Sequence, residues 1–474
     1  EIRNQKAYLA LQREMGLFAL RESKIMPNWA VVILAGGRGQ RMQSSLPKVL
    51  HQVCGKPMIC HVRDSVREVL DVVPIVVVPQ DSAAVRECLQ DEVVFAVQSD
   101  PLGTGHAVMQ AEILIPEEVS NVLVMYGDTP LVRWQSLQRL MDQHIFSGSA
   151  CTLLTTRLVS PYSMGRILRS ENDQITKIIE ERDADEEQKA IDEVNGGMYC
   201  FEREWMSSAL RNLSMSASGE YYLTDLVEMT SKAGKKVSNV ESAEKMEILG
   251  VNDRFQLNVA EATVRERVLK HWMLTGVTII DPATTYIDTD VVIGKDTTIY
   301  PNTILSGSTV VGERCRLGPN SMIYDSKTGD DCKVTASMLE GATVGSSVEI
   351  GPFSHLRAGT TLEQDVHVGN FVEVKNSRLK QGTKMGHFGY VGDAVLGRDV
   401  NVGAGTVTCN FDGIDKHTTV VGDGVFLGCD TMLVAPVEIG NGSITGAGAV
   451  VNRDIPPKNK AIGMPARFMP LETK

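Results

Sequence analysis

An apolar run in the first half of the chain ends on an acidic side chain. In the stretch LVMYGDTPL, residues 123–131, the run closes with Tyr126, Gly127 and Asp128. A carboxylate at the end of a buried strand is costly unless it faces a cleft, a partner or an ion. Gly-Asp-Thr-Pro is also good turn chemistry in any protein. These nine residues alone favour the turn, with a ligand or cation as the alternative.

A glycine-rich stretch, LAGGRGQRM at residues 34–42, offers a second kind of chemistry. Backbone N–H groups in such a loop can cradle phosphates, and Arg38 and Arg41 add positive charge. The stretch is neither G-x-G-x-x-G nor a P-loop, because no Gly-Lys-Ser/Thr follows it. Just downstream, in LPKVL, Pro47 precedes Lys48. On its own, a lysine here is most simply a solvated surface charge.

Polar side chains also gather in the second half, within FSHLRAG, FVEVKNS, MGHFGYVGDA and NVGAGTVTCNFDGIDKH. A single histidine such as His387 is more often structural than catalytic, although an imidazole suits proton transfer near neutral pH. The set comprises Arg357, Glu373, Lys375, His387, Tyr390, Asn401, Asn410 and Lys416.

The elements that must position the first group alternate along residues 26–252. Short runs rich in Val, Ile and Leu (AVVILAGG, PIVVVP, VVFAVQ, VLVMYGD) are separated by helix-like stretches such as PMICHVRDSVREVL. This alternation predicts a mostly parallel α/β sheet with helices on both faces. In such sheets ligands bind outside the carboxyl ends of the strands, which is where Asp128 lies.

Residues 253–275 predict one amphipathic helix that links the two halves, with Gly276 as its stop. Beyond it, apolar residues recur every six positions, and glycine often follows them. The recurrence is seen at Ile287, Ile293, Ile299, Leu305, Val311, Leu317 and Ile323, again at Val344, Ile350, Leu356, Leu362, Val368 and Val374, and at Val421, Leu427, Leu433 and Ile439. A sustained period of six predicts a β-solenoid whose triangular coil contains three short strands.

The composition bounds the function. A chain of 474 residues predicts two or three domains, and 43% apolar with 22% charged residues is typical of a soluble globular protein. The net charge of −12 and the lack of a basic block disfavour nucleic acid or an anionic membrane as a partner. Nine scattered cysteines indicate free thiols in a reducing compartment, and no apolar stretch is long enough for a transmembrane helix. Residues 1–25 are interpreted as an extension of unknown role, because Met26 lies just ahead of the first strand.

The ordered motifs together resemble a known family. L-A-G-G-x-G-x-R-M followed by L-P-K is similar to the sugar-nucleotide pyrophosphorylases, and QSDPLGTGHA, YGDTPL, GRI, IIEERDA, VNGG and GVNDR follow in order. With the hexapeptide half, residues 28–470 resemble the bifunctional N-acetylglucosamine-1-phosphate uridyltransferase/glucosamine-1-phosphate acetyltransferase family. The resemblance implies a Rossmann-like nucleotidyltransferase domain (26–252), a linker helix (253–275) and a left-handed β-helix acetyltransferase domain (276–474).

For the first half, the resemblance implies that Mg²⁺ is held by Asp128 and Asn252, and that Arg41 and Lys48 offset phosphate charge. Taken singly, Glu180 is equally a helix-face charge and Asn195 a turn residue. PYSMGRI departs from the family, with Ser163 and Met164 where a glycine and an aromatic residue are usual. The implied UDP-N-acetylglucosamine contacts are Leu34, Ala35, Gly36, Gly37, Lys48, Gln98, Gly103, Thr104, Gly165, Glu180, Asn195 and Asn252.

For the second half, the resemblance implies that His387 is the base for acetyl transfer and that Glu373 orients it. Glucosamine-1-phosphate would contact Arg357, Lys375, Tyr390, Asn401 and Glu373. Acetyl-CoA would lie along the coils and contact Ala404, Asn410, Phe411, Lys416, Cys429, Ala447 and Arg467, with Cys429 standing where serine is common.

The family also implies a cytoplasmic homotrimer with active sites between subunits, in which Lys416, from a loop that breaks the six-residue period, contributes in trans. Two rival hypotheses are a different sugar nucleotidyltransferase without acetyltransferase activity, and a non-catalytic regulatory subunit. The first predicts loss of His387, Tyr390 and Lys375; the second predicts loss of Lys48, Asp128 or Asn252. All six residues are present.

Overall fold

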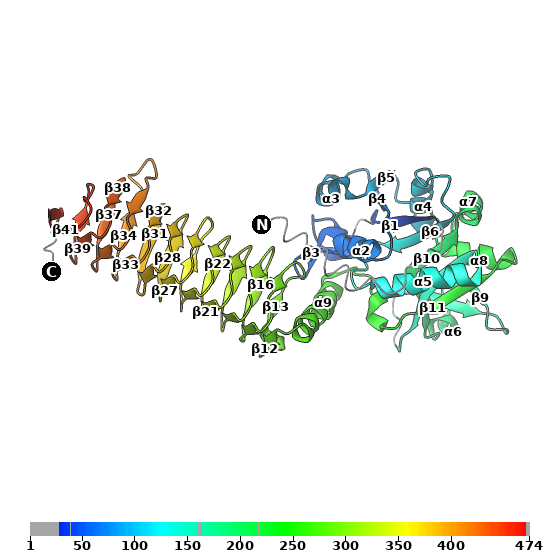
Figure 1. Ribbon diagram of the computed structural model, residues 1–474. Coiled ribbons are helices and arrows are strands. Elements are labelled where there is room, and N and C mark those ends of the chain that lie inside the picture. The colour runs from blue at the N-terminus through cyan, green and yellow to red at the C-terminus, as the bar shows by residue number, and fades with distance from the viewer. Residues whose placement is uncertain (1–27, 38, 160, 162–163, 217–218, 471–474) are drawn as a thin grey trace. The chain divides into compact units, whose positions relative to one another are not determined.

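The computed structural model describes residues 28–37, 39–159, 161, 164–216 and 219–470. The extension 1–25, Arg38 and Ser163 lie outside the described residues. The described chain divides into two compact units, which are treated separately below (Figure 1). Residues up to 50 and 58–253 form the first unit, and residues 51–57 and 254 onward form the second.

The first unit is built on a mixed nine-stranded sheet. Its main strand order is β11-β7-β10-β6-β1-β4-β5, and β8 and β9 extend from β10. β1, β4, β5 and β6 pair in parallel, whereas β10 runs antiparallel to β6, β7 and β8. The strands are β1 (Trp29–Leu34), β4 (Ile75–Pro79), β5 (Val94–Gln98), β6 (Asn121–Tyr126), β7 (Cys151–Arg157), β8 (Arg166–Arg169), β9 (Ile175–Ile179), β10 (Glu193–Glu202) and β11 (Val237–Glu241).

Helices cover both faces of this sheet, because successive residues of each central strand point to opposite sides. Val31 and Ile33 of β1 pack in the same cluster as α2, α3 and α5, and Val32 packs on the other face with α4, α7 and α8. The helices are α2 (Met58–Arg67), α3 (Ala83–Leu89), α4 (Thr104–Glu112), α5 (Trp134–Ser147), α6 (Glu186–Lys189), α7 (Arg203–Arg211) and α8 (Asp225–Lys232), with 3-10 turns at Gln40–Met42, Lys48–Leu50, Gln90–Glu92 and Lys245–Ile248.

The second unit contains helix α9 (Arg254–Leu274), which falls within the span 253–275 that the sequence predicts to be helical. A short hairpin from the first half of the chain, β2 (Gln52–Val53) and β3 (Lys56–Pro57), packs against α9. Cys54 and Gly55 both have positive φ, as a two-residue hairpin turn of this type requires. The boundary drawn from the sequence, 26–252, did not anticipate this excursion of residues 51–57.

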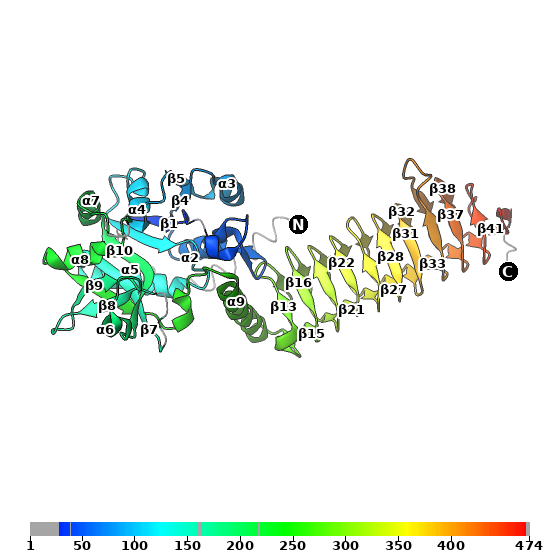
Figure 2. The same cartoon turned by 180° about the vertical axis from the view of Figure 1, so that it is seen from behind.

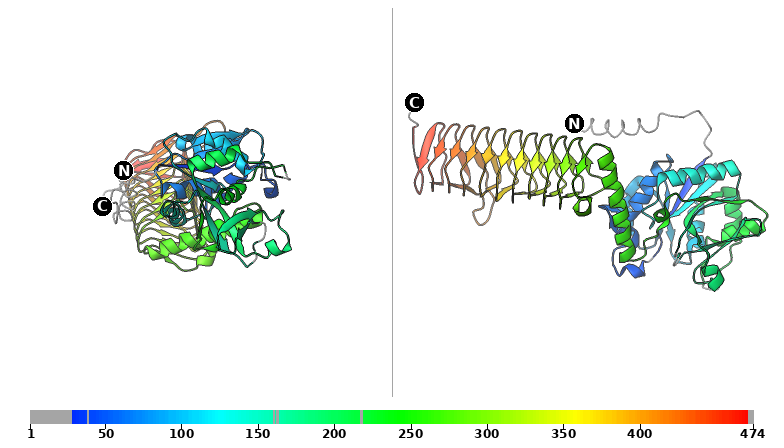
Figure 3. Two further views of the ribbon diagram at one scale, coloured as in Figure 1. Left: turned by 90° about the vertical axis from the view of Figure 1, so that its right-hand side faces the viewer. Right: turned by 90° about the horizontal axis from the view of Figure 1, so that it is seen from below.

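The rest of the second unit is a prism of parallel strands, as the period of six predicts (Figures 2 and 3). Three sheets form its faces, and most strands contribute one buried apolar residue to the interior. Pro282–Thr284 forms a 3-10 turn in the first coil. The β13 face contains β13 (Tyr286–Ile287), β16 (Ile304–Ser306), β19 (Met322–Tyr324), β22 (Met338–Glu340), β25 (His355–Leu356), β28 (Val372–Lys375), β31 (Gly389–Gly392), β34 (Val407–Cys409), β37 (Met432–Val434) and β40 (Val450–Val451).

The other two faces repeat the same register. One contains β12 (Thr278–Ile279), β15 (Thr298–Ile299), β18 (Arg316–Leu317), β21 (Lys333–Val334), β24 (Glu349–Ile350), β27 (His367–Val368), β30 (Lys384–Met385), β33 (Asn401–Val402), β36 (Phe426–Leu427), β39 (Ile444–Thr445), β41 (Asn459–Ile462) and β42 (Arg467–Pro470). The other contains β14 (Val292–Ile293), β17 (Val310–Val311), β20 (Lys327–Thr328), β23 (Thr343–Val344), β26 (Thr361–Leu362), β29 (Arg378–Leu379), β32 (Ala394–Leu396), β35 (Thr419–Val421) and β38 (Val437–Ile439).

The interruption of the apolar pattern after Ile323 does not interrupt the prism. Thr328, Val334 and Leu339 are buried in the interior positions there, so one threonine and spacings of five residues hide the period. Between β34 and β35 the chain leaves the coil as a protruding loop, in the orange part of Figure 1. Among the described residues, no helix has both the length and the hydropathy that a membrane-spanning segment needs.

Candidate active sites

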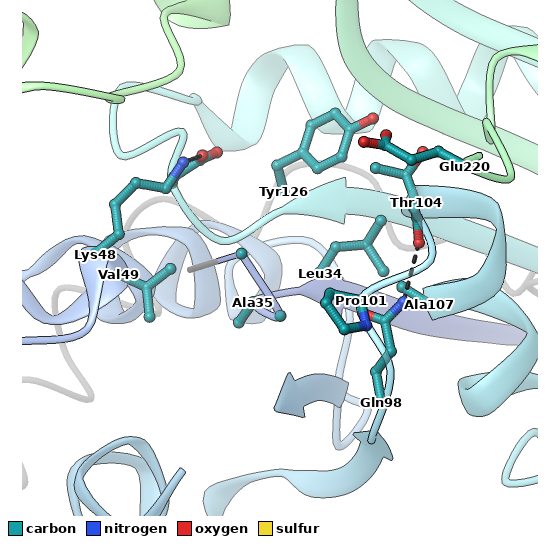
Figure 4. A pocket seen from close by; sticks show the side chains of 14 residues that line it. Leu34, Ala35, Lys48, Val49, Gln98, Pro101, Thr104, Ala107, Tyr126 and Glu220 are labelled. Atoms are coloured by element: carbon teal, nitrogen blue, oxygen red, sulfur yellow. Dashed lines mark hydrogen bonds and ion pairs between the residues drawn. The ribbon is translucent and has the colours of Figure 1, made fainter. Parts of the chain in front are cut away.

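A cavity of about 280 Å³ opens in the first unit, where β1, β5 and β6 end (Figure 4). It lies at the carboxyl edge of parallel strands, as expected for an α/β sheet. Its walls bring together most of the nucleotide-binding residues named from the sequence, which are distant along the chain. The lining residues are Leu34, Ala35, Gly36, Gly37, Lys48, Val49, Gln98, Pro101, Gly103, Thr104, Ala107, Tyr126, Asp128 and Glu220.

The glycine-rich loop lies close to its neighbours along this wall. A Cβ at Gly36 would stand 2.7 Å from Gln98 Oε1. Gly39 has φ of +62°, and a Cβ there would stand 2.7 Å from Lys48 Cβ. Gly39 therefore requires glycine, whereas a side chain at Gly36 would displace the Gln98 amide. Arg41 lies exposed in the following 3-10 turn and is not on the cavity wall.

Asp128, Lys48 and Asn252 converge from three distant parts of the chain. The Lys48 ammonium donates hydrogen bonds to Asp128 Oδ2 and, at 3.1 Å, to Asn252 Oδ1. The backbone N–H of Val251 donates to the carbonyl of Asp128 at 2.9 Å, which holds the segment of Asn252 against the end of β6. The Lys48 and Asp128 side chains are only 12% and 18% exposed. Two side-chain oxygens and one ammonium group thus meet at the edge of the cavity.

The predicted base-and-ribose residues form a second wall. Gly103, with φ of +102°, could not carry a Cβ because the Tyr221 carbonyl oxygen would be 2.5 Å away. Gln98 Nε2 donates to the Gly103 carbonyl at 3.0 Å. Thr104 is the first residue of α4, and its hydroxyl accepts a hydrogen bond from the Leu223 N–H at 3.0 Å. The turn before α4 is therefore held in place by the segment around Tyr221.

The predicted sugar-binding residues form a neighbouring cluster that is outside the cavity lining. The Asn195 N–H donates to the Gly165 carbonyl at 2.9 Å, and Asn195 Nδ2 donates to the Tyr199 hydroxyl at 2.5 Å. The Thr224 hydroxyl donates to Glu180 Oε1 at 3.0 Å. Burial raises the pKa of Glu180, against the effect of that hydrogen bond.

Tyr126 connects the two groups and was not assigned a role from the sequence. Burial, and then the carboxylates of Glu180 and Asp128, raise the pKa of Tyr126, while hydrogen bonds with Tyr199 and Thr104 oppose that shift. Glu220 also lines the cavity and accepts a hydrogen bond from Arg182 at 3.0 Å. The run GEYYLTD was also assigned no role from the sequence. Its residues 220–224 contact the turn at Gly103 and the carboxylate of Glu180.

Four residues of the second predicted group lie on or directly beside the β13 face of the prism: Arg357, Glu373, Lys375 and Tyr390. The register pairs Glu373 with Tyr390 and Lys375 with Gly392 on adjacent strands. The Arg357 N–H donates to the Val374 carbonyl at 2.8 Å, which sets Arg357 beside the same strand. Arg357 Nη1 donates to Glu373 Oε1 at 3.0 Å. The prism thus aligns residues from successive coils into one surface.

The protruding loop adds Lys416 to that surface from the same chain. The Lys416 ammonium is the main cause that lowers the pKa of Lys375, with Arg357 as a further cation nearby. Asn410 Nδ2, at the base of the loop, donates to Asp393 Oδ2 at 2.5 Å and approaches the Tyr390 hydroxyl at 3.5 Å. Three cations held close together favour binding of a dianion.

The expected pairing of Glu373 with His387 is not present as a hydrogen bond in the described residues. Glu373 is bonded to Arg357 instead, and His387 lies exposed between β30 and β31. His387 nonetheless lies two residues before β31, the strand that carries Tyr390.

The residues named for acetyl-CoA divide into three places. Ala404, Cys429 and Ala447 stack on one corner of successive coils, because Val402 pairs with Leu427 and Phe426 pairs with Ile444. The Asp430 N–H donates to the Ala404 carbonyl at 2.7 Å. Asn401 is exposed on β33 near this corner, Phe411 lies exposed on the protruding loop, and Arg467 begins β42.

Comparisons with known proteins agree with this division. The MobA-like NTP transferase domain model matches residues 31–195, and the bacterial transferase hexapeptide model, which spans six repeats, matches residues 290–325 and 418–453. The second match identifies the prism as the left-handed parallel β-helix that the repeat predicts.

Three curated relatives illustrate the likeness. The bifunctional protein GlmU of Heliobacterium modesticaldum is 46% identical over 426 residues, which is 90% of this chain and 93% of the relative. Those of Caldanaerobacter subterraneus subsp. tengcongensis and Syntrophomonas wolfei are 47% and 46% identical, over 90% and 91% of this chain and 93% and 97% of theirs.

Proposed function

Because the chain belongs to the GlmU family of bifunctional proteins, we propose that the two residue clusters described above are its two active sites, one in each unit. The protein is a bifunctional transferase of UDP-N-acetylglucosamine synthesis. It acetylates glucosamine-1-phosphate with acetyl-CoA, and it transfers UMP from UTP to N-acetylglucosamine-1-phosphate, with release of pyrophosphate. Neither rival hypothesis, a nucleotidyltransferase without acetyltransferase activity or a non-catalytic subunit, agrees with relatives that match nine tenths of the chain.

We assign uridylyl transfer to residues 26–252, connection to the helix of 253–275 and acetyl transfer to 276–474. The observation that carries the first assignment is the convergence of Lys48, Asp128 and Asn252 beside the cavity. In this reaction an oxygen of the sugar phosphate attacks the α-phosphorus of UTP, and the bond to pyrophosphate breaks. The protein's task is positioning and charge neutralisation, which Lys48 and Arg41 would supply together with the backbone of Ala35, Gly36 and Gly37.

We propose Asp128 and Asn252 as the ligands of a Mg²⁺ ion. Their two oxygens already share a cation, because both accept hydrogen bonds from the Lys48 ammonium. Among the described residues there is no group of three or more His, Cys, Asp or Glu side chains suited to a metal. A set of two oxygen ligands fits a hard cation that takes its remaining ligands from water and phosphate. When bound, the ion would neutralise phosphate charge.

The remaining wall residues would recognise the nucleotide and the sugar. Gln98, Gly103 and Thr104 hold a turn whose backbone conformation is fixed by neighbouring segments, which suits contact with uracil and ribose. Gly165, Glu180 and Asn195 would contact the N-acetylglucosamine. The hydrogen bond between Asn195 and Gly165 and that between Thr224 and Glu180 support a preformed subsite for this sugar.

At the second site, we propose that His387 takes the proton of the attacking ammonium. The amine nitrogen then attacks the thioester carbon, the carbon–sulfur bond breaks, and the CoA sulfur leaves and takes up a proton. Arg357, Lys375 and Lys416 would bind the phosphate dianion, and Tyr390, Asn401 and Glu373 would contact the sugar. The cluster of three cations around Lys375 supports this assignment.

We propose that acetyl-CoA lies along the corner formed by Ala404, Cys429 and Ala447. The register that stacks these residues in successive coils supports an extended ligand parallel to the prism axis. Asn410, Phe411 and Lys416 of the protruding loop would contact the end nearest the thioester. Arg467 would contact the other end. The backbone N–H of Ala404 is the candidate donor to the oxyanion.

We further propose that the protein is a homotrimer that works in the cytoplasm. Phe353, Phe371 and Phe388 occupy equivalent positions in successive coils and are 61%, 60% and 56% exposed. The rings of Phe353 and Phe371 stack at 5.4 Å. Such a continuous aromatic surface supports association with copies of the same chain. In that assembly Lys416 of one subunit would contribute to a neighbour's site, although within a single chain it already lies beside Lys375.

Light scattering coupled to gel filtration tests the trimer. The proposal predicts a mass near three times the 51.7 kDa chain, and a shift toward monomer in a Phe353→Ser/Phe371→Ser variant. A monomeric wild type would refute it. The use of UTP and acetyl-CoA, both made inside cells, and the scattered pattern of nine cysteines support the cytoplasmic location.

A direct test of separate sites uses His387→Ala. The proposal predicts that this variant loses acetyl transfer and keeps uridylyl transfer from added N-acetylglucosamine-1-phosphate. The two activities are measured as free CoA thiol and as pyrophosphate release. If both fell together in folded protein, the assignment of separate sites would be wrong.

A further inference from the structure

The hairpin of residues 51–57 is held by the second unit at both polar groups of one peptide segment. Glu261 Oε2, on α9, accepts a hydrogen bond from the Cys54 N–H at 2.6 Å. The Thr289 N–H donates to the Cys54 carbonyl at 3.0 Å. Cys54 is buried, and a Cβ at the adjacent Gly55 would stand 2.4 Å from Asp288 Cγ. We call Cys54, Glu261 and Thr289 the Cys54 clamp.

An ion pair reinforces the hairpin outside the clamp. Lys56 Nζ lies 2.7 Å from Asp290 Oδ1, although the Asp290 side chain is largely exposed, so this pair contributes little alone. The Glu261 contact is different. A short bond from a buried N–H to a carboxylate is a strong hydrogen bond, and its loss would leave the N–H unsatisfied.

The clamp is connected to the uridylyl-transfer site by two short segments of chain. Lys48 lies six residues before Cys54. It begins a tight 3-10 turn, in which the Leu50 N–H donates a hydrogen bond to the Pro47 carbonyl at 2.9 Å. Val49 and Leu50 are buried, so the chain between Lys48 and Cys54 has little freedom to move. On the other side, Asn252 immediately precedes Asp253 and helix α9, which carries Glu261.

These segments form a closed ring. It runs from Lys48 along the chain to Cys54, through the hydrogen bond to Glu261, back along α9 to Asn252, and through the 3.1 Å hydrogen bond from Asn252 to Lys48. His51 and Arg254 also contact each other within this ring, at 3.3 Å between Nδ1 and Nη1. Every link in this ring is covalent, helical or hydrogen-bonded.

We propose that Glu261 is a positioning residue for uridylyl transfer, which holds Cys54 and thereby sets Lys48 against Asp128 and Asn252. The inference rests on the proposed roles of Lys48 and Asn252. A misplacement of about 1 Å, even by a change far from the chemistry, costs on the order of 100-fold in rate. Loss of the clamp should therefore act on the chemical step more than on substrate binding.

The test measures both activities of the full-length protein with Glu261→Ala, Glu261→Gln and, as a matched control, Glu266→Ala, which removes an exposed carboxylate from the same helix. The proposal predicts that Glu261→Ala lowers kcat of uridylyl transfer at least about tenfold, with KM for UTP within about threefold and acetyl transfer within about twofold. Glu261→Gln, which keeps an acceptor oxygen, should restore part of the rate. Glu266→Ala should match the wild type.

Two further measurements keep the outcomes distinct. If Glu261→Ala does not fold, Glu261→Gln against Glu266→Ala provides the comparison, because Gln removes the charge from the hydrogen bond to the Cys54 N–H and should lower kcat by a smaller factor. Unchanged kcat, a change in KM alone, or an equal loss of both activities would overturn the proposal and leave the clamp a structural anchor. Lys48→Ala tests the site assignment itself. If it abolishes uridylyl transfer while Glu261→Ala does not affect it, the positioning role fails and the assigned site stands.

Discussion

Asp128 illustrates what residue types alone can and cannot predict. The nine residues around it favour a turn, and the turn is present, since the Thr129 hydroxyl donates to the Tyr126 carbonyl at 2.8 Å. The same turn delivers the carboxylate to Lys48 and the region of Asn252. The turn and a binding role for the carboxylate are therefore compatible. Only residues distant in the sequence reveal the binding role, because a binding site is assembled in three dimensions and not in a local motif.

Replacement of Asp128 by Asn keeps the shape and removes the charge. We expect the variant to lose roughly 100-fold or more of its uridylyl-transfer kcat, because the carboxylate would hold the Mg²⁺ ion that offsets phosphate charge, and such electrostatic stabilisation contributes several kcal/mol to the transition state. Pyrophosphate release with UTP, Mg²⁺ and N-acetylglucosamine-1-phosphate measures this loss. Acetyl transfer serves as the internal control and should be unchanged. Retention of half of the uridylyl-transfer rate would contradict the proposed ligand role.

His144 predicts a pH dependence of the first unit's stability. It is 2% exposed, its Nδ1 lies 2.9 Å from the Thr152 hydroxyl, and burial lowers the pKa of His144 to about 4. The unfolded chain, in which the histidine pKa is about 6.5, therefore binds more protons between about pH 6.5 and 4. The free energy of unfolding should fall as the pH drops through that window, by about 3 kcal/mol in total.

Urea denaturation followed by tryptophan fluorescence, to which Trp29 beside His144 contributes, measures this effect. Because burial raises the pKa of Glu180, its contribution has the opposite sign, and the informative quantity is the difference between wild type and His144→Gln. That difference should shrink toward acidic pH. An identical pH slope in the two proteins would show that His144 does not carry the effect.

At the scale of elements, the strongest predictions came from periodicity. Alternating apolar runs predict the parallel part of the first sheet, and the six-residue recurrence predicts the prism, because each rests on a repeating geometry. The departures have local causes. Thr328 occupies an interior position that the apolar pattern could not reveal, and shortened coils hide the phase between Ile323 and Val344.

The excursion of residues 51–57 could not be predicted in this way. Two strands of two residues carry no period, and the contacts of Cys54 with Glu261 span 207 residues. The segment 220–224 was missed for a related reason. Its contribution is a set of backbone hydrogen bonds, such as those of Tyr221 and Leu223. Such bonds cannot be predicted from residue types, because all residue types except proline have the same backbone groups.

The protruding loop makes a prediction at this scale. Its shape is held by Asp412, which accepts hydrogen bonds from His417, Ile414 and Asp415, and these bonds lower the pKa of Asp412. The loop presents Lys416 beside Lys375. We expect Lys416→Met to raise KM for glucosamine-1-phosphate by about tenfold or more, since a hydrogen bond between charged groups contributes about 1.5–3 kcal/mol.

Lys384→Met, an exposed lysine on β30, is the matched control and should leave that KM unchanged. Initial rates of acetyl transfer at saturating acetyl-CoA give both values. Removal of Lys416 should also raise the pKa of Lys375 toward its ordinary value. An unaltered KM in Lys416→Met would exclude the loop from phosphate binding.

For the whole molecule, the main feature is that two groups of reactive side chains belong to two units with separate cores. The product of the acetyl-transfer site is the substrate of the uridylyl-transfer site. Separate sites exchange this intermediate through solution, so two damaged copies of the protein should complement each other. A single shared site could not be complemented in this way.

The most direct measurement of that central claim mixes His387→Ala with Asp128→Asn in the presence of glucosamine-1-phosphate, acetyl-CoA, UTP and Mg²⁺, and follows UDP-N-acetylglucosamine by chromatography. Each variant alone should form almost none from these substrates, because each lacks one of the two steps. The mixture should form it at a rate approaching that of the wild type. Absence of product from the mixture, with wild type active under the same conditions, would contradict the account.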